Sequence, residues 1–365
     1  MNSPPTAPDR QRANSPRAAP DRLPVNSPPT APDRLPHVSV VVPARDCAAA
    51  IGECLSAIGA QTYRGAVDVT VAVAPSHDGT AQAVASAGIE LPVRVVENPA
   101  GTAAAGLNLA VAASEGPVVA RVDAQSRIPP GYLERAVSTL ARTGAANVGG
   151  VQRPVGAEGL PGAIAAAIRS PFGGGPAAFR RGRHSGPADT VYLGVFDRDA
   201  LESVGGFDET LGRNQDYELN WRLREQGRTV WLDPSLVVDY VPRSDYSGLA
   251  RQYFAYGAWK RTVLVRNPRS LRIRQFAAPA LVAGLACSAF ALALGRLRGA
   301  ALPVLYAGAC AAAAIRMRGV LLGRLDRARA AAAFAVMHLS WGAGFLAGRA
   351  RNLRAAAQRA ASESR

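Results

Sequence analysis

Apolar and polar positions alternate in blocks from about residue 37 onward, in the pattern of strands separated by helices. Short runs rich in β-branched residues predict strands at Val38–Val42, Val67–Val73, Val93–Val96 and Val118–Val122. The spacing between these runs predicts helices at Ala48–Ala60, from about Thr80, and at Ala103–Ala113. Strands that alternate with helices indicate an α/β fold with a parallel sheet.

Polar residues follow the carboxyl ends of the predicted strands. They are Arg45, Asp46, Asp78 and Asp123. Ligands of open α/β sheets bind in the crevice at the carboxyl ends of the strands. This placement is the first indication of a functional site, although spacing alone leaves the chemistry of an α/β enzyme unspecified.

Two acids stand out as candidates for chemistry, and each has a structural alternative. Asp123 follows the apolar run VVARV, where its carboxylate could hold a metal ion or cap the next helix. Two leucines four residues apart predict a helix at Gln215–Glu225. Asp216 in its first turn interacts favourably with the helix dipole and suits a general base, but Asp216 and Glu218 could equally serve to stabilise the helix. Asp78, in PSHDGT, could likewise cap a turn.

The C-terminal part of the chain contains long apolar segments at 276–294, 300–315 and 328–348. A membrane span needs roughly 20 apolar residues, with a range of about 17–25, so the first and third segments qualify and the second is marginal. Because alanine is only weakly apolar, a soluble helical bundle is the alternative. Arginines flank the segments on both sides, which suits lipid headgroups but leaves the orientation open.

Other segments complete the organisation of the chain. Residues 1–36 repeat NSPPTAPDR with a period of twelve, and this proline-rich leader is predicted to be disordered. Gly156–Gly186 predicts a flexible loop over a cleft or an exposed linker. Leu249–Arg266 mixes aromatic and basic residues, as in a helix on a membrane surface or a core helix of the domain. We expect domains at 1–36, 37–265 and 266–365.

The charge of the chain is concentrated beside its most hydrophobic part. The net charge is +15, and Tyr240–Arg365 alone carries +17 from 19 arginines and one lysine against three acids. Basic residues next to apolar segments favour anionic lipid headgroups over a nucleic-acid groove. Because no aromatic and basic platform or zinc-knuckle spacing is present, nucleic acid is not expected as a partner.

A set of motifs in fixed order resembles family 2 glycosyltransferases of the GT-A fold, over about residues 37–265. The motifs are VSVVVPARD (Val38–Asp46), GECLSAIGAQTY (Gly52–Tyr63), VAPSHDGT (Val73–Thr80), NPAGTAAAGLN (Asn98–Asn108), VARVDAQSRIPPGYL (Val119–Leu133), YLGVFDRDALESVGGFDE (Tyr192–Glu209) and QDYELNWRLREQG (Gln215–Gly227). With its hydrophobic C-terminal tail, the arrangement is similar to the bacterial exopolysaccharide branch, the succinoglycan-type transferases.

The resemblance implies an inverting transfer of a sugar from a nucleotide-sugar donor. It implies Asp123 as the first acid of the metal-binding DxD motif, with Mg2+ or Mn2+, and Asp216 as the catalytic base. Asp239 stands near the position of a further metal ligand. Substrate contacts are implied for Pro43, Ala44 and Asp46 at the nucleotide, Asp78 near the base or ribose, Gly206 at the acceptor side, and Asn108 and Glu218.

The sequence departs from the family pattern at several of these positions. Ala74 stands where the family usually has an acid, which affects recognition of the base. Gln125 replaces the second acid of DxD, and Gln215 replaces the glutamate before the catalytic aspartate. The QxxRW element of processive synthases is absent as such, because Gln252 and Trp259 are too far apart. A single addition is therefore expected.

The expected acceptor is a glycan or a polyprenyl-linked saccharide, and membrane lipid is an expected partner. Because nucleotide sugars are cytosolic, we expect a multi-pass protein of the cell membrane with its catalytic domain in the cytoplasm. The alternatives are a non-catalytic relative that binds a nucleotide or glycan, and a processive polysaccharide synthase. A nucleotidyltransferase is disfavoured, because Pro43–Ala50 has no glycine-rich basic loop.

Overall fold

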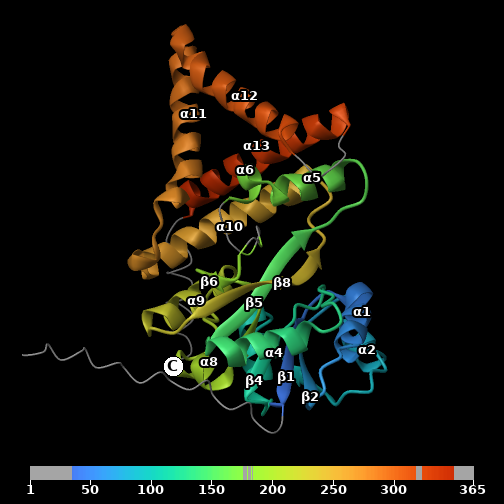
Figure 1. The fold of residues 1–365 in the computed structure, drawn as a ribbon. Coiled ribbons are helices and arrows are strands. Elements are labelled where there is room, and N and C mark those ends of the chain that lie inside the picture. Colours follow the sequence, from blue (N-terminus) through green and yellow to red (C-terminus); the bar gives the residue numbers. More distant parts are fainter. Residues whose placement is uncertain (1–34, 176–178, 180–181, 183, 318–322, 349–365) are drawn as a thin grey trace, which may run out of the picture. The chain divides into compact units, whose positions relative to one another are not determined.

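The computed structural model describes residues 35–175, 179, 182, 184–317 and 323–348. The predicted leader, up to residue 34, lies outside these residues. The described residues form an eight-stranded sheet with the order β3-β2-β1-β4-β7-β5-β8-β6 (Figure 1). The strands are β1 (Val38–Ala44), β2 (Val67–Val73), β3 (Val93–Glu97), β4 (Val118–Arg121), β5 (Asn147–Pro154), β6 (Gly186–Pro187), β7 (Tyr192–Asp197) and β8 (Val230–Tyr240).

The expectation of a parallel sheet holds for most of the strand pairs, including β5 with β8, and fails where β7 and β6 join the sheet. β1 pairs in parallel with β2 and β4, and β2 pairs in parallel with β3. β7 is antiparallel to both β4 and β5. The reason is that the chain leaves β5 at Pro154 and returns at the same end of the sheet, where Tyr192 pairs with Gly150. The sheet is therefore mixed.

Alternate residues of β1 enter two separate hydrophobic cores, which explains its uninterrupted apolar sequence. Val40 and Val42 pack on one face with α1 and α4, and Val41 packs on the other face with α3, α8 and α9. The helices over the two faces are α1 (Ala48–Gly59), α2 (Thr80–Ala85), α3 (Ala103–Ala112), α4 (Tyr132–Thr143), α8 (Arg198–Ser203) and α9 (Gln215–Glu225). The helix predicted at Gln215–Glu225 has the same bounds in the structure, and its two leucines are fully buried.

The glycine-rich stretch between β5 and β7 contains helices where a loop or linker was predicted. They are α5 (Leu160–Arg169) and α6 (Pro171–Gly174), and residues 176–178, 180, 181 and 183 lie outside the description. Ile164, Ala167 and Ile168 are buried in a third core together with Phe334 from the C-terminal part. The prediction was wrong because a short alanine-rich helix becomes stable only when a distant segment covers its apolar face.

The C-terminal part consists of α10 (Tyr246–Arg266), α11 (Ala277–Ala293), α12 (Ala301–Ile315) and α13 (Arg324–Ala347). Among the residues that the structure describes, three helical segments are long and apolar enough to cross a membrane: Ile273–Ala293, Leu297–Ile315 and Arg324–Ala347. Only 6% of the apolar window of the first and 11% of the second is buried. A soluble bundle would bury such a face, so their exposure favours lipid contact over the bundle.

α10 and α13 lie side by side and cross at very short range (Figure 1). A β-carbon added to Gly257 of α10 would overlap the carbonyl oxygen of Trp341, and one added to Gly344 of α13 would overlap that of Phe254. Glycine is required at both positions because the two backbones touch. α10 also buries Leu249 and Tyr253 in the third core, so it has the packing expected of a core helix.

Candidate active site

The two acids singled out from the sequence are joined by one arginine. Arg121 is the last residue of β4, and its side chain is 11% exposed. Its Nε donates to Asp123 Oδ1 at 3.0 Å, and its Nη1 pairs with Asp216 Oδ1. The Asp123 and Asp216 carboxylates are 36% and 44% exposed, so both also face solvent. Residues 93 positions apart in the chain thus meet in one charged cluster.

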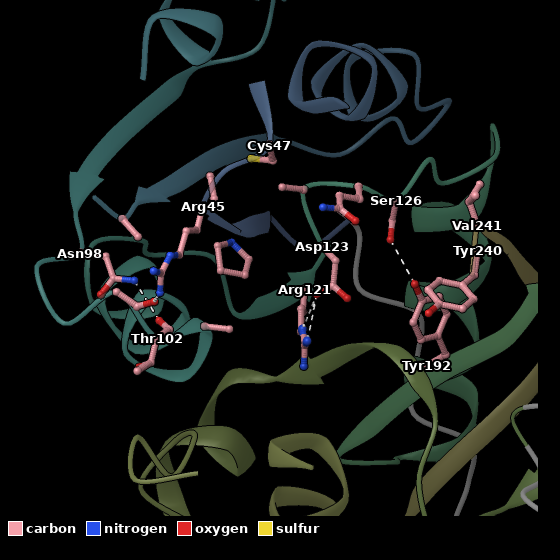
Figure 2. Close-up of a pocket in the computed structure, with 17 residues that line it drawn as sticks. Arg45, Cys47, Asn98, Thr102, Arg121, Asp123, Ser126, Tyr192, Tyr240 and Val241 are labelled. Carbon is pink, nitrogen blue, oxygen red and sulfur yellow. Dashed lines mark hydrogen bonds and ion pairs between the residues drawn. The ribbon is translucent and has the colours of Figure 1, made fainter. Parts of the chain in front are cut away.

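The first cavity, of about 340 Å³, opens at the carboxyl ends of β1, β2 and β4. Figure 2 shows Arg121 and Asp123 in its middle, between Arg45, Asn98 and Thr102 on one side and Tyr192 and Tyr240 on the other. Its lining also includes Pro43, Ala44, Cys47, Ala74, Gly101, Ala103, Ala124, Gln125, Ser126 and Val241. Ligands of open α/β sheets bind at this place in the fold.

The second cavity, of about 1050 Å³, lies between α9, the segment 240–245 and α10. Asp216 and Tyr217 of α9 line it, together with Lys260 of α10 and Trp341 of α13. The two cavities share Arg121, Asp123, Gln125, Tyr192, Tyr240 and Val241. Asp123 therefore stands in the wall common to both cavities, and Asp216 faces the second from beside it.

Of the residues predicted to contact the nucleotide, Pro43 and Ala44 line the first cavity. Asp46 and Asp78 instead form hydrogen bonds between the loops that follow β1 and β2. Asp46 has a positive φ of 45°, and its Oδ1 accepts from the amide of His77 at 3.1 Å. Asp78 accepts from the Ala48 amide at 2.9 Å and from the Thr80 hydroxyl at 2.6 Å. The hydrogen bond from the Thr80 hydroxyl, followed by that from Ala48, lowers the pKa of Asp78 below its usual value. Neither carboxylate is part of the cavity lining.

Asn108, Gly206 and Glu218 lie around the loop before α9 and not in the lining of either cavity. Asn108 Nδ2 donates to the Phe207 carbonyl at 2.9 Å, and Asn108 Oδ1 accepts from the Phe207 amide at 2.9 Å. Glu218 pairs with Arg222, whose Nη2 donates to the Gly206 carbonyl at 2.7 Å. The loop presents the Phe207 ring 5.8 Å from the Arg121 guanidinium. These residues thus position the ring against which the central arginine rests.

Asp239, the further metal ligand implied by the resemblance, pairs with Arg153 through distances of 2.5 and 3.1 Å. Its side chain does not line either cavity, whereas the adjacent Tyr240 lines both. The structure therefore does not bring Asp239 to Asp123 in the cavities.

The side chains around Asp123 suit a metal ion that is coordinated partly by the protein and partly by the bound substrate. Within the described ranges, no group of three His, Cys, Asp or Glu side chains is arranged for a metal ion. Asp123 offers one carboxylate, and the Gln125 side chain lines the same two cavities. Mg2+ is commonly bound through one or two carboxylates, substrate phosphates and water. The residues present fit such a shared cation and not a site made by protein alone.

Sequence reasoning missed Arg121, Tyr192 and Lys260. The Tyr192 hydroxyl lies 3.1 Å from Ser126 Oγ, and burial raises the pKa of this tyrosine above its usual value. The sequence did contain an indication for Arg121. An arginine inside the apolar run VVARV is expected to be buried and therefore to pair with acids. Lys260, the only lysine of the chain, had no comparable signal in its local sequence.

A mixed α/β sheet with carboxylates at the strand ends, facing two joined cavities, is the arrangement expected of a GT-A type transferase. Residues 36–257 match the family described as glycosyltransferase like family 2. The succinoglycan biosynthesis protein ExoA of Rhizobium meliloti is 31% identical over 283 residues, which cover 76% of this chain and 84% of that protein. The chain belongs to glycosyltransferase family 2.

Further relatives agree with this assignment. A dolichyl N-acetyl-α-D-glucosaminyl phosphate 3-β-D-2,3-diacetamido-2,3-dideoxy-β-D-glucuronosyltransferase of Methanococcus voltae is 32% identical over 117 residues, 32% of this chain and 36% of that one. The mannosyltransferase PcManGT from Pyrobaculum calidifontis, solved in complex with GDP-Man and Mn2+, has the same fold with a TM-score of 0.63. It is 23% identical and covers 87% of this chain and 88% of its own.

The enzyme class predicted from the motifs is thereby confirmed. The chain is a glycosyltransferase with a GT-A fold that takes its sugar from a nucleotide-sugar donor. It also carries three helices of a length and apolarity suited to a membrane.

Proposed function

We propose that the nucleotide sugar binds in the first cavity and that a lipid-linked saccharide binds in the second, with direct transfer between them. The observation that carries this proposal is the shared wall of the two cavities, where Arg121 joins Asp123 to Asp216. A transfer with inversion needs the donor and acceptor on opposite sides of the reacting carbon. Two cavities that meet at the acids satisfy this requirement.

Asp216 is the proposed general base. The acceptor hydroxyl attacks the anomeric carbon, its proton passes to the Asp216 carboxylate, and the bond from the anomeric carbon to the diphosphate oxygen breaks. The diphosphate leaves with the electron pair of that bond. Asp216 lies in the first turn of α9 and lines only the second cavity, which supports a role on the acceptor side. A positioned base contributes roughly 10²–10⁴ to the rate.

The donor side combines pocket residues with residues that hold the pocket in shape. Pro43, Ala44 and Ala74 form an apolar wall for the nucleoside, and Arg45 spans the rim through its hydrogen bond of 3.1 Å to the Gly101 carbonyl. Asp46 and Asp78 stabilise this rim through the loop contacts described above. The complex of PcManGT with GDP-Man supports a nucleotide sugar as the ligand.

Mg2+ or Mn2+ is the proposed cofactor, held by Asp123 together with the donor diphosphate. Such a cation neutralises negative charge on the departing diphosphate when it is bound. Arg121 contacts Asp123 through one carboxylate oxygen, and Asp123 would share its carboxylate between this guanidinium and the cation. Asp239 stays a predicted ligand without support from the cavity lining.

The acceptor side points to a substrate carried by lipid. Trp341, which lines the second cavity, belongs to α13, one of the three helices suited to a membrane. A saccharide linked to a lipid in the membrane could enter the cavity along this helix. Since nucleotide sugars are cytosolic, the catalytic domain is proposed to face the cytoplasm.

The test compares Asp216→Asn with Asp199→Asn in the full-length protein purified in detergent. Asp199 is an exposed acid in the first turn of α8 and lies outside both cavities, which makes it a matched control. Release of nucleoside diphosphate is measured with GDP-mannose and a panel of UDP-sugars in the presence of Mn2+. Asp216→Asn is expected to lose about 100-fold or more of the activity, and the control should retain it. A folded Asp216→Asn protein with wild-type turnover would refute the proposed mechanism.

A further inference from the structure

The second cavity is lined by more positive than negative side chains. Arg121, Arg213, Arg243, Arg251 and Lys260 face it, against the acids Asp123, Asp216 and Asp245. The acids already have partners. Arg121 contacts both Asp123 and Asp216. Asp245 accepts hydrogen bonds from the Ser247 hydroxyl and the Gly248 amide at the start of α10. The wall of the cavity thus carries positive charge that these acids do not neutralise.

Within the described part of the chain, four of the cations have no acid in direct contact, although Asp245 acts on Arg251 and Asp189 on Lys260 at longer range. Across the ranges that the structure describes, Arg213, Arg243, Arg251 and Lys260 form no ion pair with a carboxylate. Arg243 and Arg251 line the cavity and are exposed to solvent. Lys260 is nine residues further along α10, or about 13 Å at 1.5 Å per residue. These four cations therefore extend along the wall instead of meeting at a single point.

Lys260 is the buried member of this set. Only 7% of the residue is exposed, and its ammonium lies 3.0 Å from the centre of the Tyr217 ring. A ring face stabilises an ammonium but does not neutralise it. A buried charge without a counter-ion in direct contact is unfavourable unless the site exists to receive one. Lys260 therefore indicates an anionic ligand.

Arg213 lines the same cavity and lies over a second tyrosine, which belongs to the same helix as Lys260. Its guanidinium is 5.6 Å from the centre of the Tyr256 ring, one helical turn before Lys260 on α10. Gln252 fixes this ring, since its Nε2 donates to the Tyr256 hydroxyl at 3.0 Å and to the Tyr240 hydroxyl at 2.9 Å. Tyr217, under Lys260, directly follows Asp216 in α9. The two cations are thus held in place beside the acid proposed as the base.

We propose that Arg213 and Lys260 bind the phosphate or diphosphate that links the acceptor saccharide to its lipid. This inference rests on the proposed function, because it names the anchoring group of the ligand in the acceptor-side cavity. The acceptor sugar would lie between this anion and Asp216, with its lipid directed along Trp341. Arg243 and Arg251 extend the positive wall toward the far end of the cavity.

Binding to the full-length protein in nanodiscs of neutral lipid tests this proposal without any turnover. The probe is farnesyl diphosphate, and farnesol and inorganic pyrophosphate separate the contributions of chain and anion. Arg213→Gln and Lys260→Met are compared with Arg269→Gln, an exposed arginine that lies outside the cavity. Removing a charged hydrogen-bonding partner should raise the Kd of farnesyl diphosphate by about tenfold or more, and the control should leave it unchanged.

Each outcome of the binding experiment has a definite meaning. Wild-type affinity in both cavity variants, or equal affinity for farnesol, would overturn the phosphate site. Displacement of farnesyl diphosphate by nanodiscs that contain phosphatidylglycerol would assign the site to bulk lipid headgroups and overturn it as an acceptor site. Arg213 is exposed, so Arg213→Gln keeps the test valid if Lys260→Met fails to fold. The binding assay involves no turnover, so its result is separable from the loss of transfer expected for Asp216→Asn.

Discussion

Arg121 is the residue on which the geometry of the site depends. Its guanidinium contacts both acids and lies over the Phe207 ring, 5.8 Å from its centre. Without it, two carboxylates would face each other across the wall shared by the cavities. Their repulsion would displace one of them from the position in which it can act.

Arg121→Leu is therefore expected to reduce kcat/KM by about 10–100-fold, as is usual when a charged hydrogen-bonding partner worth about 1.5–3 kcal/mol is removed. Steady-state kinetics of nucleoside diphosphate release measure this effect. Arg64→Leu, which removes an exposed arginine next to β2, is the matched control and should stay within about twofold of wild type. Equal activity of the two variants would show that the bridge has no catalytic importance.

Lys260 makes acceptor binding dependent on pH. Burial, followed by repulsion from Arg274, lowers the pKa of this lysine to about 7, while Asp189 opposes the shift and Arg224 adds to it. Tyr217 is the remaining ionisable group in contact with the ammonium. The lysine is charged below this pKa and neutral above it, so the affinity for an anion should fall as the pH rises from 6 to 8.

Titrations with farnesyl diphosphate at several pH values measure this dependence. The wild-type Kd should increase by up to about tenfold per pH unit above 7 relative to Lys260→Met, because one proton is lost per lysine. The comparison with the variant removes the ionisation of the diphosphate itself. Parallel curves for the two proteins would show that Lys260 does not take part.

At the scale of elements, the crossing of α10 and α13 joins the catalytic domain to the apolar region. Arg261 of α10 donates to the Leu346 carbonyl at 2.8 Å, and the Tyr246 hydroxyl donates to the Arg329 carbonyl at 3.0 Å. Between these contacts the helices touch through Gly257 and Gly344. The second cavity, lined from both helices, depends on this spacing.

Gly257→Ala tests the crossing against Gly308→Ala in α12, where an added β-carbon meets nothing within 4 Å. Alanine favours a helix over glycine by about 1 kcal/mol, so the control should be neutral or stabilised. Gly257→Ala should instead lower the thermal unfolding midpoint in detergent, because its methyl group has no space beside Trp341. Overpacking of this kind costs about 1–3 kcal/mol. An unchanged midpoint for Gly257→Ala would contradict the close crossing.

Local sequence predicted the elements well where they carry a strong internal pattern. β2 and α9 have the predicted bounds, because their residues alternate or repeat with the right period. α5 was missed because it lies in a stretch that is rich in alanine and glycine and has no clear helical pattern. Its apolar face is buried only by packing against α13. The direction of β7 was also beyond local reasoning, since it depends on where the chain re-enters the sheet.

At the scale of the whole molecule, the enzyme combines a nucleotide-sugar domain with helices that leave their apolar faces exposed. The Ile273–Ala293 window has a mean hydropathy of 2.0 and is 6% buried. Such surface is stable in lipid and unfavourable in water. The protein is therefore expected to behave as an integral membrane protein.

Extraction of membranes with carbonate at high pH measures this property. The full-length chain should remain in the membrane pellet and should be released by detergent alone. A peripheral protein held by basic residues would be released, because its binding is electrostatic and its attraction to anionic lipid is lost with added salt. Release into the supernatant would favour the helical bundle that the apolar segments also allow.

The sequence by itself determined the enzyme class and the strands and helices of the first half of the sheet, and it singled out Asp123 and Asp216 as candidates. Motif order and hydrophobic period are local properties, so they can be read directly from the chain. Only the tertiary structure decided that Arg121 joins these acids, that Asp46, Asp78 and Asn108 support loops, and that Lys260 faces the second cavity. These relations join residues far apart in the chain, and the packing of helices on the sheet determines which of them meet.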